Sequence, residues 1–163
     1  MKNKKISMIA ALSKNNVIGK DGGLPWHIKK DFSWFVSQTI GKTIVMGRKN
    51  YEDIIKYTKG KPLKDRKNII LTNKDINPVG FYVEHDINNL LNSSEDLMII
   101  GGAEIYKQFL PYADQLILTE IDSVIEGDIY FPNYNKADFQ ETFRKSDIEN
   151  DLHFDFVIYD KCV

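Results

Sequence analysis

The sequence has few of the residues from which metal centres, disulfide scaffolds and covalent active sites are built. Its one cysteine, Cys162, cannot form an internal disulfide, which favours a reducing compartment. The three histidines, His27, His85 and His153, have no metal-ligand spacing among them, so we expect no metal centre. No GxSxG motif or comparable nucleophile signature is present. Catalysis by a metal ion or by a protein nucleophile therefore has no support in the sequence.

Long apolar runs and an excess of one charge are absent as well. No segment approaches the roughly 20 apolar residues of a membrane span. The short apolar run near the N-terminus leads into polar residues rather than a cleavage site. A net charge of -1 argues against general binding to nucleic acid or to anionic membranes. Because 42% of the 163 residues are hydrophobic and 28% are charged, we expect one cytoplasmic globular domain over residues 1–163.

Short apolar runs alternate with helix-like stretches along most of the chain. Nearly continuous apolar character predicts strands at 6–12, 43–46, 68–71, 97–100 and 116–119. Between them, the spacing of apolar residues predicts helices at 28–38, 48–56, 87–92 and 103–110. This alternation is typical of βαβ units that build a parallel sheet covered on both faces.

The C-terminal part of the chain has a different pattern. Alternating apolar residues predict strands at 139–144 and 153–161, and the polar segment 146–151 is expected to join them as an antiparallel hairpin. The lysine-rich segment 57–67 is expected to be an exposed loop. The predicted fold class is α/β, with a mostly parallel twisted sheet of about eight strands, the hairpin at one edge and about four flanking helices.

One acid stands out in the predicted helix at 28–38. On a helical wheel, Ile28, Phe32 and Phe35 share one face, and the lysines and serines lie opposite. Asp31 falls on or beside the apolar face, where an isolated charge must be paired, hydrogen-bonded or neutralised. This pattern alone leaves two interpretations open, a structural ion pair and a functional carboxylate.

Three further segments have the composition of ligand-binding loops. In IIGGAEIY, residues 99–106, paired glycines join a strand to a helix, which aims free backbone N–H groups at any ligand above them. A tight turn explains these glycines equally well. NNVIGKDGGLPW, residues 15–26, is either a plain connection or a flap over a site. MGRK, residues 46–49, places two cations at a helix start, where a bound phosphate would favour them. Two solvated charges are the commoner case.

Eight segments, taken in order and spacing, resemble those of the bacterial dihydrofolate reductases over essentially the whole chain. They are ISMIAAL, VIGKDGGLPW, KKDFSWF, TIVMGRKNYEDI, RKNIILT, MIIGGAEIYKQFLP, LILTEID and EGDIYFP. The resemblance implies the fold of that family, with an adenosine-binding subdomain at roughly 42–94 and a loop subdomain in the remainder. It implies reduction of 7,8-dihydrofolate to tetrahydrofolate for one-carbon metabolism, by hydride transfer from NADPH to C6 with protonation of N5. The implied partners are dihydrofolate and antifolate inhibitors, and the implied oligomeric state is a monomer.

The resemblance assigns the substrate site to two polar groups, a set of apolar walls and one arginine. Asp31 matches the acid that hydrogen-bonds the pterin 2-amino group and ring nitrogen, and Thr119 matches the threonine that supports this end of the ring. Arg66 matches the arginine that grips the α-carboxylate of the glutamate tail, a role that suits a bidentate guanidinium. Leu24 and Trp26 match the catalytic lid. The implied apolar walls are Ile9, Ala10, Phe35, Ile54 and Leu63.

The resemblance also implies a binding site for NADPH. Gly101 and Gly102, which a cis peptide joins in this family, match the pyrophosphate cradle. Arg48 is placed for the 2′-phosphate that distinguishes NADPH from NADH. The nicotinamide end is assigned to Ala11, Ile18 and Gly19. The other implied cofactor-binding residues are Gly47, Lys49, Asn50, Leu71, Thr72, Asn73, Ile100, Ala103, Glu104, Ile105 and Tyr106.

Some positions depart from the family pattern. Asn50 stands where a threonine is usual, and Asn73 where serine is frequent, although both amides can still form hydrogen bonds. Glu104 replaces a residue that is often basic, which should weaken the attraction for the cofactor phosphates. Lys61 stands where arginine is frequent, and the segment 55–59 looks inserted.

The expected mechanism depends on the protonation of Asp31. Desolvation in an apolar cleft should raise its pKa, whereas hydrogen bonds to a cationic ring favour the ionised form. In the implied geometry Asp31 lies too far from N5 to donate the proton, so we expect it to hold and polarise the ring while water delivers the proton.

Two alternatives remain at this stage. One is a related reductase acting on another pterin or on a ribosylated pyrimidine, and the other is a non-catalytic protein that binds a pterin or NADPH. Arg66 favours folate, because a pyrimidine substrate has no glutamate tail to bind. The intact acid, lid and paired glycines favour an enzyme.

Overall fold

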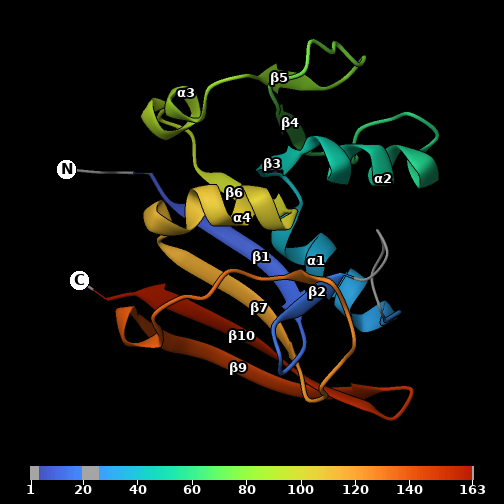
Figure 1. Cartoon of the computed structure of the whole chain (residues 1–163), viewed down its shortest axis with the longest axis vertical. Helices are drawn as coiled ribbons and strands as arrows, with labels where there is room; N and C mark the ends of the chain where they lie inside the picture. The colour runs from blue at the N-terminus through green and yellow to red at the C-terminus, as the bar shows by residue number, and fades with distance from the viewer. Residues whose placement is uncertain (1–3, 20–25, 163) are drawn as a thin grey trace.

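A twisted eight-stranded sheet forms the centre of the computed structural model, which describes residues 4–19 and 26–162 (Figure 1). The strand order is β5-β4-β3-β6-β1-β7-β10-β9. These strands are β1 (Ile6–Leu12), β3 (Thr43–Gly47), β4 (Lys67–Leu71), β5 (Tyr82–Glu84), β6 (Leu97–Gly101), β7 (Gln115–Ile121), β9 (Phe139–Glu149) and β10 (Leu152–Lys161). Pairing is parallel from β5 to β7, and β10 is antiparallel to both β7 and β9. The predicted α/β sheet with an antiparallel hairpin at one edge is confirmed.

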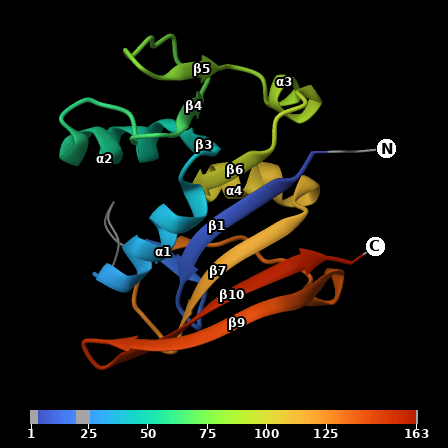
Figure 2. The ribbon, with the colours of Figure 1, turned by 180° about the vertical axis from the view of Figure 1, so that it is seen from behind.

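The four predicted helices are also present, and their ends differ from the prediction by at most two residues. They are α1 (Lys29–Thr39), α2 (Arg48–Thr58), α3 (Ile87–Asn92) and α4 (Ala103–Phe109), with 3-10 turns at Leu110–Tyr112 and Lys136–Asp138. Helices α1 and α2 cover one face of the sheet, and α3 and α4 cover the other (Figures 1 and 2). Among the described residues, no helix combines the length and the apolar character that a membrane crossing requires.

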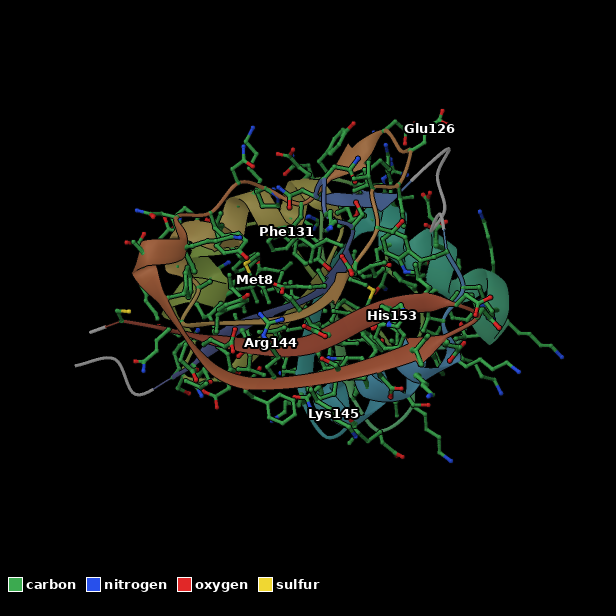
Figure 3. All side chains as sticks on the ribbon, turned by 90° about the horizontal axis from the view of Figure 1, so that it is seen from below. Met8, Glu126, Phe131, Arg144, Lys145 and His153 are labelled. Atoms are coloured by element: carbon green, nitrogen blue, oxygen red, sulfur yellow. The ribbon has the colours of Figure 1, made fainter. Side chains whose placement is uncertain are left out.

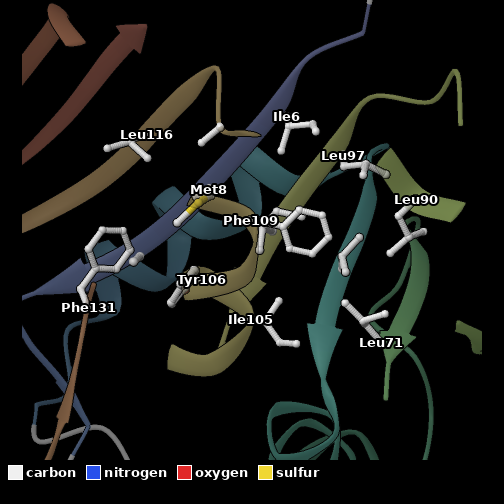
Figure 4. Close-up of a cluster of buried hydrophobic side chains, with 14 of the residues drawn as sticks. Ile6, Met8, Leu71, Leu90, Leu97, Ile105, Tyr106, Phe109, Leu116 and Phe131 are labelled. Carbon is white, nitrogen blue, oxygen red and sulfur yellow. The ribbon is translucent and has the colours of Figure 1, made fainter. Parts of the chain in front are cut away.

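Alternation along the strands divides the apolar side chains between these two faces. On β1, Met8 packs with Phe109 of α4 in one core (Figure 4), whereas Ile9 packs with Ile54 of α2 in the other. Each of these side chains is less than 5% exposed. Burial of one such side chain stabilises the fold by about 1.5–3 kcal/mol, so the two cores together fix the position of the strands.

The C-terminal hairpin is longer than its pattern predicts. Strand β9 continues to Glu149, so the prediction of a polar linker at 146–151 is wrong over most of that segment. Only Asn150 and Asp151 form the turn, and both have positive φ (52° and 62°), as a two-residue hairpin turn of type I′ requires. Hydrophobic alternation did not predict the full length of β9, because β9 is an edge strand whose side chains are mostly exposed. Polar residues therefore replace the alternating apolar residues. Figure 3 shows β9 and β10 side by side across the molecule.

The structure also differs from the sequence prediction at the end of α2 and in two short additional strands. Helix α2 runs to Thr58 and ends at Lys59 in the left-handed conformation (φ 56°), so the inserted-looking segment 55–59 is the last helical turn and its cap rather than loop. The short strands β2 (Val17–Gly19) and β8 (Ile129–Tyr130), which pair in a separate two-stranded sheet, had no detectable pattern because they span only two or three residues.

Candidate active site

Several of the predicted site residues lie at or just beyond the carboxyl ends of the parallel strands. The register of β1 and β7 places Ala11 opposite Thr119. The register of β3 and β6 places Met46, the residue before Gly47, opposite Gly101. Parallel α/β sheets bind ligands outside these strand ends, because the loops that follow the strands converge there.

Asp31 and Thr119 meet across the gap between α1 and β7. Asp31 lies in the first turn of α1, and the Thr119 hydroxyl donates a hydrogen bond of 2.5 Å to its Oδ1. Burial raises the pKa of Asp31 above its ordinary value, and the hydrogen bond from Thr119 opposes this shift only in part. No arginine or lysine side chain lies within ion-pair distance of Asp31 among the described residues. A part-buried carboxylate held by one hydroxyl suits a polar or cationic ligand better than a structural ion pair.

Four of the five predicted wall residues belong to one apolar cluster. Ile9 and Ile54 are buried in it, and Phe35 and Leu63 pack against it. Ala10, the fifth, has its side chain in the core on the opposite face, because successive residues of a strand alternate. Ala10 can therefore contribute only backbone to this site.

Phe32 corrects the helical-wheel interpretation of α1. The wheel predicts it on the buried face, yet its side chain is 62% exposed. Phe35 and Trp34, one turn further along α1, pack against the sheet instead. A large exposed aromatic one residue after Asp31 is a further candidate for ligand contact that the periodicity of the sequence concealed.

Of the two predicted lid residues, Leu24 lies outside the described residues. Trp26 packs in an apolar cluster with Ile28 and Phe154. Its indole Nε1 is buried and has no hydrogen-bond partner among the described residues. A buried donor without a partner costs about 1–3 kcal/mol, so this N–H suits a bound water or ligand.

Arg66 is oriented by a residue that the sequence interpretation missed. Its Nη1 donates to Thr39 Oγ1 (2.9 Å) and its Nε donates to the Lys64 carbonyl (2.9 Å). Thr39 is buried at the end of α1, and its hydroxyl donates in turn to the Phe35 carbonyl (2.8 Å). These bonds fix the guanidinium against α1. Partial burial lowers the pKa of Arg66, although the group remains cationic.

The Gly101–Gly102 peptide is cis, as the family resemblance implies. Gly101 has φ 116°, and a Cβ on it would lie 3.0 Å from the Tyr106 ring. Gly102 is exposed, with nothing within 4 Å of the position of a Cβ, so a ligand can approach its backbone there. Tyr106 is buried beneath them, where its hydroxyl lies 2.5 Å from the Ile9 carbonyl and 2.9 Å from the Ile100 carbonyl. Tyr106 therefore supports the turn from below.

The start of α2 brings a cation to the same strand ends. Gly47 caps the helix, and a Cβ there would lie 2.8 Å from the Ile105 side chain, which explains the glycine. Arg48 follows and forms an ion pair with Glu52 one turn later. Asn50, which replaces the usual threonine, donates from Nδ2 to the Ile100 carbonyl (3.2 Å) and so ties α2 to the end of β6.

The remaining predicted cofactor residues differ in accessibility. Leu71, Ile100 and Ile105 are buried, so they shape the site from beneath. Those with exposed side chains are Lys49, Asn73 and Glu104, and those of intermediate exposure are Ala11, Ile18, Thr72 and Ala103. Gly19 is buried in β2.

A polar hollow of about 670 Å³ lies elsewhere, lined by residues of β7, β9 and β10 and of the loops around residues 13–16 and 133–136. Its lining includes Lys14, Asp122 and Lys136, and none of the predicted site residues. Because small-molecule sites are mostly apolar, this hollow is a poorer candidate than the site around Asp31.

Thr119→Val tests the electrostatics of the site. The substitution keeps the shape of the side chain and removes its hydroxyl, so we expect the pKa of Asp31 to rise further in the free enzyme. A ¹³C NMR titration of the carboxyl groups measures this shift. Thr142→Val is the matched control, because the Thr142 hydroxyl donates to a different carboxylate, that of Asp160 (2.6 Å), within the β9–β10 hairpin. A pKa of Asp31 that stays constant or falls would contradict the argument.

The chain is similar to known proteins over almost its whole length. The family model described as dihydrofolate reductase matches residues 5–161. The chain is 44% identical over 152 residues to a dihydrofolate reductase of Buchnera aphidicola subsp. Acyrthosiphon pisum, covering 91% of this chain and 92% of the relative. It is 39% identical over 158 residues to the dihydrofolate reductase of Haemophilus influenzae, covering 93% and 96%. The structure of a dihydrofolate reductase from Enterococcus faecalis complexed with NADP(H) and RAB-propyl superposes with a TM-score of 0.85, at 29% identity over 96% of each chain.

Proposed function

The chain belongs to the dihydrofolate reductase family and is an NADPH-dependent oxidoreductase that reduces 7,8-dihydrofolate, and from this premise we propose how its residues divide the work. The observation that carries the proposal is the part-buried carboxylate of Asp31, which accepts a hydrogen bond of 2.5 Å from the Thr119 hydroxyl and lies on the same helix as Phe35 of the apolar cluster. Dihydrofolate, rather than another pterin or a ribosylated pyrimidine, is the substrate that the matched relatives support.

Asp31 and Thr119 hold the pterin ring. Asp31 accepts hydrogen bonds from the 2-amino group and a ring nitrogen, and the partial positive charge that these bonds stabilise makes N5 easier to protonate. Asp31 does not transfer the proton itself. A water molecule delivers it, and the buried Nε1 of Trp26, which has no hydrogen-bond partner among the residues that the structure describes, supports the presence of such a water.

Apolar residues and one arginine hold the rest of the substrate. Ile9, Phe35, Ile54 and Leu63 form a cluster that excludes water from the ring. Arg66, which Thr39 and the Lys64 carbonyl orient, retains free donors for the carboxylate of the glutamate tail.

The residues at the strand ends fit NADPH. Gly102 has open space where a side chain would stand, and the backbone there can approach a pyrophosphate. Arg48 supplies a cation for the 2′-phosphate, and Lys49, Thr72 and Asn73 supply further donors around the adenosine. When bound, NADPH supplies the hydride that reduces C6 of dihydrofolate.

A spectrophotometric assay tests the proposed function directly. We expect NADPH absorbance to fall when dihydrofolate is added to the purified protein, and a diaminopyrimidine antifolate to block that fall. A flat trace from protein that binds NADPH would contradict catalysis.

Arg48→Gln is expected to weaken NADPH binding by about 10- to 100-fold and to leave NADH binding nearly unchanged, because a charge-assisted hydrogen bond contributes about 1.5–3 kcal/mol. Fluorescence titration with both cofactors measures the two dissociation constants. Lys56→Gln, at the exposed far end of the same helix, is the control. Equal losses for NADPH and NADH would contradict a 2′-phosphate contact.

We also propose a division into subdomains, an oligomeric state and a cellular compartment. We infer an adenosine-binding subdomain at roughly 42–94, because Arg48, Lys49, Thr72 and Asn73 all fall within it. We also infer a monomer in the cytoplasm, and the lone cysteine supports a reducing compartment. Sedimentation analysis of the purified protein tests the monomer.

A further inference from the structure

Helix α1 carries Asp31 in its first turn, yet it begins without a cap of its own. The residue at its N-terminal boundary is Ile28, whose side chain makes no capping hydrogen bond. The first N–H groups of a helix have no partner within the helix, and Ser, Thr, Asp or Asn normally accepts from one of them. An apolar residue at this boundary leaves that role to another part of the chain.

Glu149, at the tip of the β9–β10 hairpin, takes this role. Its Oε2 accepts the backbone N–H of Lys29 at 2.6 Å, and its Oε1 accepts that of Lys30 at 2.9 Å. These two backbone hydrogen bonds lower the pKa of Glu149, so the group is ionised at neutral pH. A negative charge at the positive end of the helix dipole adds to the capping effect.

The hairpin contacts α1 at further points. Lys30 Nζ lies 2.7 Å from Asp147 Oδ1 and donates to the Ile148 carbonyl at 3.2 Å. The Trp34 ring stacks on Phe156 of β10 at 4.7 Å and on Phe143 of β9 at 5.8 Å between ring centroids. Figures 1 and 2 show the hairpin tip on the same side of the molecule as the start of α1.

We propose that Glu149 is a positioning residue for the reaction: it caps α1 from the hairpin tip and thereby holds Asp31 against Thr119 on β7. The proposal rests on the role assigned to Asp31 in the proposed function. Asp31 directly follows the two residues whose N–H groups Glu149 accepts. The capped turn therefore determines where the carboxylate stands relative to the hydroxyl 2.5 Å away.

The effect on catalysis should exceed the effect on folding. Glu149 and the two lysines it caps lie at the surface, so water replaces the lost acceptor when the side chain is removed. Water does not hold the first turn of α1 in one position, however, so Asp31 in that turn loses its fixed place. A displacement of about 1 Å in a positioned group costs up to about 100-fold in rate.

The test compares Glu149→Ala and Glu149→Gln with the matched control Asp147→Asn. Asp147 lies on the same hairpin tip. Among the described residues its carboxylate accepts from the Lys30 side chain and the Ile148 N–H and from no N–H group of the helix. The readouts are kcat per folded enzyme, the dissociation constant for NADPH, the melting temperature and the isotope effect on kcat with 4-deuterated NADPH. A merely structural role would move the melting temperature alone.

We expect Glu149→Ala to lower kcat by about tenfold and to raise the isotope effect, because hydride transfer becomes slower relative to product release. Glu149→Gln keeps one acceptor oxygen and should lower kcat by about two- to threefold, with a smaller rise in the isotope effect. Asp147→Asn should stay near the wild type, and NADPH affinity should be unchanged in all three variants.

Wild-type kcat and isotope effect in Glu149→Ala would overturn the proposal, as would an equal loss in Asp147→Asn. If the alanine variant does not fold, Glu149→Gln tests the proposal instead. A wild-type isotope effect in Glu149→Gln, together with unchanged NADPH binding, would also overturn the proposal. Asp31→Asn, measured in parallel, distinguishes a failure of the proposed role of Asp31 from a failure of the proposed role of Glu149. If Asp31→Asn retains turnover, the role of Asp31 is wrong.

Discussion

Asp31→Asn is expected to lower the rate of dihydrofolate reduction by about 100- to 10,000-fold at neutral pH and to leave the dissociation constant of NADPH nearly unchanged. An amide has no negative charge to stabilise the protonated ring, and its NH₂ group opposes the donors of the pterin. Asp31 lies on α1 and is bonded by Thr119 on β7, whereas the Gly101–Gly102 turn joins β6 to α4, so we expect cofactor binding not to depend on the charge of Asp31. Steady-state kinetics and fluorescence titration measure the two effects.

Asp53→Asn is the matched control for this substitution. Asp53 is exposed on α2, where it forms a long ion pair of 3.5 Å with Lys56, so its loss should leave both measurements unchanged. Near-wild-type turnover in Asp31→Asn would contradict the role assigned to the carboxylate.

The same substitution should stabilise the protein in the absence of ligands. Because the pKa of Asp31 is raised in the folded state, this state binds more protons than the unfolded state at pH values between the unfolded and folded pKa. The free energy of unfolding therefore falls as the pH rises through that window, and the cost persists at neutral pH. Urea unfolding at neutral pH should find Asp31→Asn more stable than the wild type, and at low pH the two should converge.

The second large effect is expected at the paired glycines, where two similar substitutions should fail in different ways. Gly101→Ala should lower the free energy of unfolding by about 2–5 kcal/mol, because φ is 116° and the new Cβ would lie 3.0 Å from the Tyr106 ring. Displacing Tyr106 would also disturb its hydroxyl, which lies at hydrogen-bond distance from carbonyls on β1 and β6.

Gly102→Ala should leave folding almost intact and weaken NADPH binding by about 10- to 100-fold, because the new methyl group fills the space that a pyrophosphate requires. Nothing lies within 4 Å of this Cβ position, and φ is -85°, which any residue adopts. Chemical unfolding and NADPH titration of both variants measure the contrast. Tight NADPH binding by Gly102→Ala would contradict the cradle, and an unchanged stability of Gly101→Ala would contradict the packing argument.

The central part of the fold could be predicted from local pattern because burial on both faces leaves little freedom. Strands β1, β3, β4 and β6 each contain a nearly continuous apolar run whose residues are buried. The hairpin could not be delimited, because β9 is an exposed edge strand whose charges resemble those of a loop. The pairing of β2 with β8 depends on contacts between residues more than a hundred positions apart, which local pattern does not encode.

A site residue could be predicted where the chemistry of its own side chain indicates its role. It could not be predicted where the role depends on contacts with residues elsewhere in the chain. Asp31 was recognisable as an acid on an apolar face, and its hydrogen bond to Thr119 agrees with that interpretation. Two features depend on tertiary contacts that no local pattern reveals: Thr39 orients Arg66, and Phe32 is exposed on α1. The cap from Glu149 belongs to the same class, because the apolar Ile28 indicated only that a cap was missing. The ion pair between Arg48 and Glu52 is different, because it joins residues four apart on one helix and the spacing of the charges indicates it.

A crystal structure with NADP⁺ and folate bound is the most direct test of the claim that Asp31 binds the pterin. We expect both carboxylate oxygens of Asp31 within hydrogen-bond distance of the 2-amino group and a ring nitrogen, with Thr119 still donating to Oδ1 and the ring against Ile9 and Phe35. A pterin bound in the polar hollow that β7, β9 and β10 line, or bound at the strand ends with Asp31 turned away from it, would contradict this claim.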